Sequence, residues 1–181
     1  TFLASLRPLA QLHARHTVGM LDELDGAASH PVDDGLPVTL ADVIHRYGNT
    51  HFKLKLSGER GWDLERLGGI ARVLDRSDAP YRVTIDGNEQ FADVEQLLDL
   101  WGAIEARPEL ARLAASTLMI EQPVGRAIAL DRPMQRMSQH CPVIIDESDG
   151  TLDAFVRARR HGYRGVSTKA CKGLYKSLIN T

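Results

Sequence analysis

The fold of this chain is decided by the stretch Val83-Thr84-Ile85-Asp86, a short β-branched run that ends on a carboxylate. Four further apolar runs end on charged residues in the same way: Phe52-Lys53-Leu54-Lys55, Leu118-Met119-Ile120-Glu121, Val143-Ile144-Ile145-Asp146-Glu147 and Val166-Ser167-Thr168-Lys169. Continuous runs of this kind are typical of buried parallel strands, whose carboxyl ends carry the chemistry of parallel α/β folds. The runs therefore predict that three carboxylates and two lysines converge on one spot.

Segments with helical spacing of apolar residues separate these runs. They predict helices over residues 63–74, 91–101, 131–138 and 152–160, and a final helix that begins near Leu174. The charged tips recur at intervals of roughly 30 residues, which is the length of a βαβ unit. This alternation predicts a parallel sheet.

An open doubly wound sheet and a closed barrel both fit the alternation, but five charged tips favour the rim of a barrel, because an open sheet gathers its site on few strands. A complete eight-stranded barrel needs about 250 residues. This chain has 181 residues and six expected strands, so we expect a TIM-type (β/α)₇β barrel that is incomplete in this chain. A longer parent chain, missing disordered segments or a partner would supply the rest.

Residues 1–51 form an N-terminal segment that leads into the partial barrel of residues 52–181. In this segment we expect a helix over Leu3–His16, a first strand over Thr17–Leu21, an irregular stretch over 26–37 and a short helix over Leu40–Tyr47.

The composition indicates a soluble protein without a nucleic-acid or membrane partner. The net charge is −2 and the basic residues form no stripe. Two unpatterned cysteines and the lack of a signal peptide favour a cytoplasmic location, and a homo-oligomer is compatible with the sequence. Lys172 and Lys176 have the spacing of one helical face, which predicts solvated side chains.

Asp86, Glu121 and Asp146 are oxygen ligands at the ends of three successive strands. They suit a hard cation such as Mg²⁺ or Mn²⁺ rather than Zn²⁺. Three acids at one rim would repel one another without a cation, which favours metal binding over three separate caps or turns. Such a cation keeps open positions, and it could stabilise the enediolate formed when a base removes the proton α to a carboxylate.

Lys55 and Lys169 lie on strands that flank the three acidic strands, so each could approach one face of the α-carbon of a small carboxylate substrate. Each must be neutral to act as a base, and a positive neighbour such as Lys53 or the metal would lower its pKa. Two opposed bases permit racemisation, epimerisation or elimination.

Five motifs follow one another along residues 52–178: Lys53-Leu54-Lys55, Asp86-Gly87-Asn88, Glu121-Gln122-Pro123, Asp146-Glu147-Ser148 and Thr168-Lys169-Ala170-Cys171-Lys172-Gly173. In this order they resemble the barrel domain of the enolase superfamily, and most of all its muconate-cycloisomerase-like branch within the mandelate racemase/muconate lactonizing enzyme family. The resemblance implies a Mg²⁺ held by Asp86, Glu121 and Asp146, acid/base catalysis by Lys55 and Lys169, a pKa-tuning or substrate-binding Lys53, and outer-shell roles for Asn88 and Glu147. The α+β capping domain and the last barrel strands of such enzymes are not seen.

The sequence thus predicts a Mg²⁺-dependent lyase or isomerase, that is, a dehydratase, an epimerase or racemase, or a cycloisomerase. One alternative is a non-catalytic, metal-binding barrel fragment, which the short length favours. Another is an aldolase that forms a Schiff base through Lys169, but it leaves the three carboxylates unexplained.

Overall fold

The structure, a computed structural model, describes residues 5, 7, 9–29 and 34–179. Its strands are β1 (His16–Val18), β2 (His51–Lys55), β3 (Arg82–Asp86), β4 (Thr117–Glu121), β5 (Val143–Ile145) and β6 (Gly165–Val166). Its α-helices are α2 (Leu40–Tyr47), α3 (Arg60–Leu74), α4 (Val94–Glu105), α5 (Ala111–Ser116), α6 (Arg126–Ala129), α7 (Gln135–His140), α8 (Ala154–Arg160) and α9 (Leu174–Ile179). Two 3₁₀ helices are η1 (Pro108–Leu110) and η2 (Ala170–Lys172).

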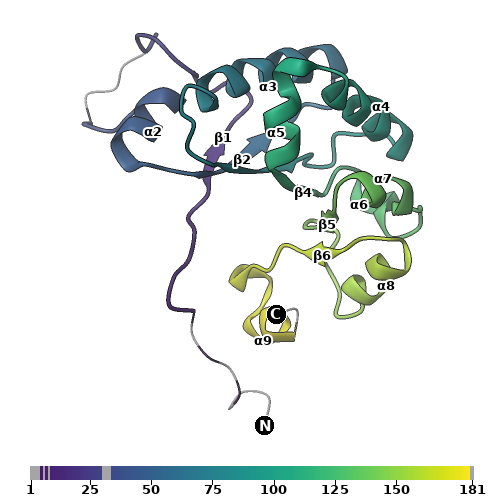
Figure 1. Cartoon of the computed structure of the whole chain (residues 1–181). Coiled ribbons are helices and arrows are strands. Elements are labelled where there is room, and N and C mark those ends of the chain that lie inside the picture. The colour runs from purple at the N-terminus through teal and green to yellow at the C-terminus, as the bar shows by residue number, and fades with distance from the viewer. Residues whose placement is uncertain (1–4, 6, 8, 30–33, 180–181) are drawn as a thin grey trace.

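The six strands form one parallel sheet in the order in which they occur along the chain. Helices α3, α4 and α5 lie along one side of this sheet, and the sheet curves so that β6 and α9 come round below it (Figure 1). Consecutive parallel strands joined by helices are the repeating unit of a TIM-type barrel. The predicted fold class, an incomplete barrel of this type, is confirmed.

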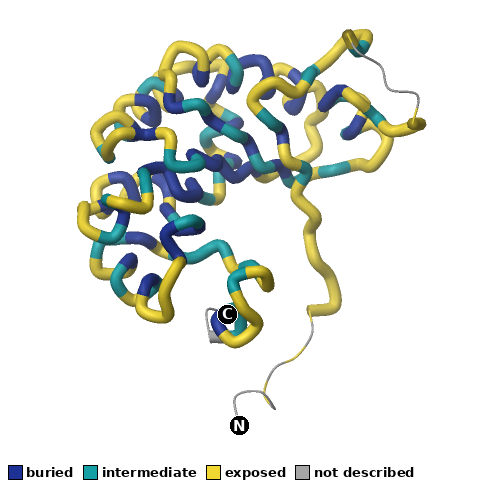
Figure 2. Tube along the Cα trace, turned by 180° about the vertical axis from the view of Figure 1, so that it is seen from behind, coloured by how far each residue is buried: buried dark blue, intermediate teal, exposed yellow. Residues whose placement is uncertain are grey.

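The hydrophobic core lies between the sheet and the helices. On β2 the residues alternate, so that Phe52 and Leu54 are buried among helices while Lys53 and Lys55 occupy the other face. Val83 and Ile85 of β3 enter the same core. Figure 2 shows the buried residues concentrated along the strands and on the sheet-facing sides of the helices. The polar face of the sheet is therefore left to carry the charged residues.

Strands β2 to β5 confirm four of the five predicted runs, with differences of one or two residues at their ends. The fifth prediction is wrong in part, because β6 covers only Gly165–Val166 and Lys169 lies three residues beyond it. The backbone of Ser167 still donates to the carbonyl of Ile145, at 2.8 Å. The polar sequence after Val166 offers no aliphatic side chain that would extend the strand into the core.

Among the helices, α2 has the predicted bounds, and α3, α4, α8 and α9 confirm four further predictions with shifted ends. The segment 131–138 does not form one helix, since α6 ends before it and α7 begins at Gln135. Helix α5 has no counterpart among the predictions. The described helices include none that is both long and apolar enough to span a membrane.

The N-terminal segment differs most from the prediction. Residues 9–15 are exposed and not helical, and they run away from the body as an extended segment (Figure 1). Residues 3, 4, 6 and 8 of the predicted helix lie outside the described residues, as do residues 30–33 of the irregular stretch. The first strand is β1, two residues shorter than predicted. Leu9 and Leu12 are more than two-thirds exposed, so a helix here would have no core to bury its apolar face.

Candidate active site

Strand register places Lys55, Asp86 and Glu121 at one level of the sheet. In the parallel ladders, Lys55 is the partner of Asp86 and Asp86 is the partner of Glu121. Ile144 is the partner of Glu121, so Asp146, which follows the last residue of β5, stands two residues further along the chain and on the same face. The three predicted carboxylates therefore form a row across β3, β4 and β5, which we call the carboxylate row.

Lys53 holds the first two members of the carboxylate row together. Its ammonium group lies 2.8 Å from Asp86 Oδ2 and 2.8 Å from Glu121 Oε2. Both acids are almost completely buried. Burial lowers the pKa of Lys53, but the two carboxylates outweigh burial and raise it above its ordinary value. Lys53 is thus a cation wedged between two buried anions.

Asp146 follows β5 directly and is paired with two lysines of the following segment. Lys169 contacts its Oδ2 atom, and Lys172 lies 2.7 Å from its Oδ1 atom. Burial alone would raise the pKa of Asp146, but the ammonium groups of Lys169 and Lys172 outweigh it and lower this pKa to about 2. The Asp146 carboxylate is therefore firmly ionised.

Lys55, Asn88 and Glu147 form a chain of contacts beside the row. The Lys55 ammonium donates to Asp86 Oδ2 at 2.7 Å and also to Asn88 Oδ1. The Asn88 amide in turn donates to Glu147 Oε1 at 3.2 Å. The structure thus brings together all eight residues that the sequence singles out, from Lys53 to Lys169, although their chemical roles stay predictions.

The loops after β3 and β4 are held in an unusual backbone conformation. Asn88 and Gln122 have φ angles of 42° and 36°, in the left-handed region that few non-glycine residues adopt. Between β3 and Asn88, Gly87 packs so closely that a Cβ atom would meet the Cα atom of Pro123 at 2.6 Å. Such strain persists only where surrounding contacts fix it, and here it brings two carboxylate-bearing strand ends together.

Gln122 is a site residue for which the sequence predicted no role. Its side chain is fully buried, and its Oε1 atom accepts from the backbone N–H groups of Asp146 at 2.8 Å and Ser148 at 3.0 Å. Its Nε2 atom donates to Ser148 Oγ at 2.7 Å. Gln122 therefore ties the end of β4 to the start of the loop that carries Asp146. Its position directly after Glu121 was the only available signal.

The prediction of solvated side chains at Lys172 and Lys176 is wrong. Lys172 contacts Asp146, and the mostly buried Lys176 lies 2.9 Å from Asp149 Oδ1. Lys172 belongs to η2 and Lys176 to α9, so the two do not share one helical face.

The carboxylate row suits a hard divalent cation by its chemistry. It offers buried oxygen donors. Among the described residues Glu121 Oε1 has no hydrogen-bond partner, while Oε2 is held by the ion pair with Lys53. As the side chains lie, however, no three His, Cys, Asp or Glu groups of the described residues stand together as a metal site. Lysine ammonium groups supply the positive charge in this arrangement. The residues fit Mg²⁺, provided that the carboxylates turn from the lysines toward it.

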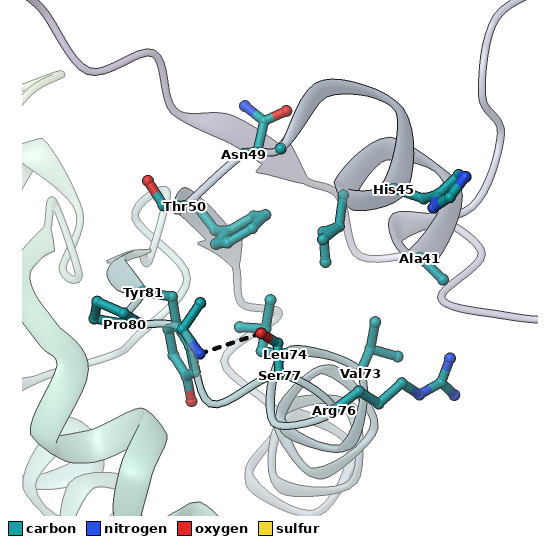
Figure 3. A pocket seen from close by; sticks show the side chains of 14 residues that line it. Ala41, His45, Asn49, Thr50, Val73, Leu74, Arg76, Ser77, Pro80 and Tyr81 are labelled. Atoms are coloured by element: carbon teal, nitrogen blue, oxygen red, sulfur yellow. Dashed lines mark hydrogen bonds between the residues drawn. The ribbon is translucent and has the colours of Figure 1, made fainter.

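A separate cavity of about 420 Å³ lies at the opposite ends of the strands. Figure 3 shows its lining, which includes Thr50 beside the start of β2, Tyr81 before β3 and Arg76 after α3. The carboxylate row does not contribute to it. In parallel α/β barrels the chemistry sits at the carboxyl ends of the strands, so we assign the site to the row.

The sequence matches no protein-family model, and a search of curated proteins found no match. Solved structures do match. A mandelate racemase/muconate lactonizing protein from Herpetosiphon aurantiacus is 25% identical, with a TM-score of 0.63 over 77% of this chain. Muconate cycloisomerase from Pseudomonas fluorescens is 23% identical, with a TM-score of 0.57 over 76% of this chain.

A third match is a dipeptide epimerase from Cytophaga hutchinsonii, whose structure is described as complexed with Mg and the dipeptide D-Ala-L-Val. It is 21% identical, with a TM-score of 0.62 over 92% of this chain. This chain spans 37%, 36% and 40% of the lengths of these three chains. The predicted resemblance to the mandelate racemase/muconate lactonizing enzymes of the enolase superfamily is confirmed in the fold.

Proposed function

We propose that this chain forms the catalytic part of a lyase or isomerase that removes the proton α to a substrate carboxylate. One observation carries the proposal: a lysine ammonium group contacts each outer end of the carboxylate row, Lys55 at Asp86 and Lys169 at Asp146. A small carboxylate lying over the row has an amine at either end. That arrangement suits two acid/base groups, one for each face of the α-carbon.

The protonation of Lys169 depends on the charge of Asp146. Burial lowers the pKa of Lys169, but the contact with Asp146 outweighs burial and keeps its pKa above the ordinary value. In this ion pair Lys169 is a proton donor. It would be a proton acceptor with a second cation compensating Asp146, because burial would then act on the amine without the opposing carboxylate.

The row itself is proposed to hold Mg²⁺ through Asp86, Glu121 and Asp146. When bound, Mg²⁺ supplies positive charge that stabilises the negative charge developing on the substrate carboxylate. With the cation held by these carboxylates, the Lys53 ammonium would be available to pair with the substrate carboxylate. The magnesium in the Cytophaga hutchinsonii epimerase structure and the oxygen-only donor set of this chain both support this proposal.

The test is exchange of the substrate α-hydrogen for deuterium in D₂O with Mg²⁺, followed by proton NMR. The probes are D-Ala-L-Val and muconolactone. The first is bound in the Cytophaga hutchinsonii epimerase structure, and the second in a structure of a similar muconate lactonizing enzyme from Pseudomonas fluorescens. In an epimerase, Lys169→Ala should remove exchange from one face and Lys55→Ala from the other, each by about 10²–10⁴-fold.

Arg157→Met is the control, because Arg157 pairs with Asp131 and does not touch the row. It should keep the exchange rate. Undiminished exchange in the Lys55→Ala/Lys169→Ala double variant would contradict the proposed bases. Mg²⁺ binding without exchange of either probe would favour the non-catalytic alternative for these substrates.

A further inference from the structure

Lys172 is held far more firmly than its neighbour Lys169. Its ammonium nitrogen lies 2.7 Å from Asp146 Oδ1, 2.8 Å from the Asp146 carbonyl and 2.9 Å from the Ser167 carbonyl. An ammonium group has three N–H donors, so these three oxygens use all of them. The Lys172 side chain is 18% exposed, whereas that of Lys169 is 41% exposed.

The two lysines take different oxygens of the same carboxylate. Lys172 contacts Oδ1 and the backbone of Asp146, while Lys169 contacts Oδ2. Movement of Lys169 toward a substrate would release Oδ2 and leave Oδ1 held. The carboxylate of Asp146 therefore has one fixed oxygen and one that can be offered to a ligand.

A second ion pair fixes the segment on which Lys172 lies. Lys176 of α9 contacts the carboxylate and the backbone carbonyl of Asp149, and both residues are mostly buried. Asp149 also lies 3.7 Å from the Lys172 ammonium. Lys172 thus stands between two acids of the loop after β5. Without it, among the described residues, Asp146 would keep only Lys169 and Asp149 only Lys176 as ion-pair partners.

We infer that Lys172 is a positioning residue, which clamps the loop after β5 to the segment after β6 and directs Asp146 Oδ2 toward the bound ligand. This inference deepens the proposed function and rests on it where the ligand is a divalent cation. It assigns to Lys172 a role distinct from that of Lys169: the former orients a carboxylate, and the latter moves a proton.

The test is whether a substitution raises or lowers the affinity for Mn²⁺. Electron paramagnetic resonance measures this affinity, with Mn²⁺ alone as the probe. Removing a neighbouring positive charge should strengthen cation binding. Removing a positioning residue should weaken it. We expect Lys172→Met to weaken Mn²⁺ binding about tenfold or more, and Lys169→Met, which frees Oδ2, to strengthen it.

Two further variants separate positioning from general stability. Lys172→Arg keeps the charge and the donors, so it should restore most of the affinity. Leu110→Ala, which leaves a cavity in the core where η1 packs on α3 and α4, should lower the melting temperature while leaving the Mn²⁺ affinity within about twofold. Unchanged or stronger Mn²⁺ binding in Lys172→Met would overturn the inference.

Labelling of the metal-free protein separates failure of the clamp from failure of the proposed function. In a pulse of acetic anhydride read by mass spectrometry, Lys169 should react at least about ten times faster than Lys172. Asp146→Asn should speed the labelling of Lys172 but not of Lys176. Equal labelling rates at Lys169 and Lys172 would refute the positioning role of Lys172. Wild-type protein that binds no Mn²⁺ but still protects Lys172 from labelling would refute only the proposed metal binding.

Discussion

Lys55 and Lys169 reach the carboxylate row from opposite flanks, one from a strand and the other from a loop. Lys55 ends β2, which is paired with β3 at five consecutive positions. Lys169 follows β6, which is paired with β5 at only two positions. The backbone ladder therefore fixes Lys55, while Lys169 depends on ion pairs with Asp146 and on the clamp through Lys172.

The two flanks show two ways to place the same chemical group. Ladder hydrogen bonds between backbones hold a residue in place whether its side chain is buried or exposed, and they do not depend on side-chain charge. Ion pairs place a residue only while both partners stay charged and desolvated together. We expect the β6 flank to be less stable and more sensitive to charge substitutions than the β2–β3 flank.

The largest expected effect compares the cores of the two flanks. Ile85 of β3 is 1% exposed, whereas Val166 of β6 is half-buried. In urea unfolding, Ile85→Ala should lower the free energy of unfolding by about 3–4 kcal/mol, because it leaves a closed cavity. Val166→Ala should cost about 1 kcal/mol. Equal losses would show that β6 is packed as firmly as β3.

Gln122 links the two flanks, so its loss should have the next largest effect. Gln122→Ala leaves the buried N–H groups of Asp146 and Ser148 without their acceptor. We expect a loss of about 2–3 kcal/mol in the free energy of unfolding, because unsatisfied buried donors are costly. Gln135→Ala is the control, since exposed Gln135 makes a single bond to the Arg160 carbonyl. It should change stability by less than about 0.5 kcal/mol, and a similar effect of both variants would remove the linking role of Gln122.

The smallest expected effect concerns the close approach of the β3 and β4 ends. Gly87→Ala would place its Cβ 2.6 Å from the Pro123 backbone, so the two loops must move apart at a cost of about 1–2 kcal/mol. Gly102→Ala on α4 meets no atom within 4 Å and should instead stabilise the protein by about 0.5–1 kcal/mol. Thermal unfolding of both variants checks this. Stabilisation by Gly87→Ala would mean that the β3 and β4 loops can separate freely.

The sequence predicted the parts of the molecule that local pattern determines. The strands followed from continuous aliphatic runs, and the bounds of α2 follow from Thr39, whose side chain caps the helix, and from Gly48, which ends it at a φ of 63°. The position of Asp86 beside Glu121 could be predicted because each residue ends one of two adjacent parallel strands. These features depend on residues close together in the sequence.

What failed depends on distant contacts. The extended segment 9–15 has apolar residues at helical spacing, but no described element covers them as a core. Lys172 is the opposite case: the sequence predicts a solvated side chain, but it is mostly buried. Its burial depends on a short strand, a 3₁₀ turn and an acid 26 residues earlier. Gln122 is likewise determined by its partners on the loop after β5. No local pattern contains that information.

The Lys53 bridge between Asp86 and Glu121 has a consequence for how the protein matures. In small zinc domains, the ligands cannot come together until the metal arrives, so the apo chain stays unfolded. Here Lys53 and Lys55 bring two positive charges to Asp86 and Glu121, so the β-ladders close around carboxylates whose charge is already compensated. Under the proposed function, folding would not require the cation, because lysine side chains already compensate the carboxylate charges of the row.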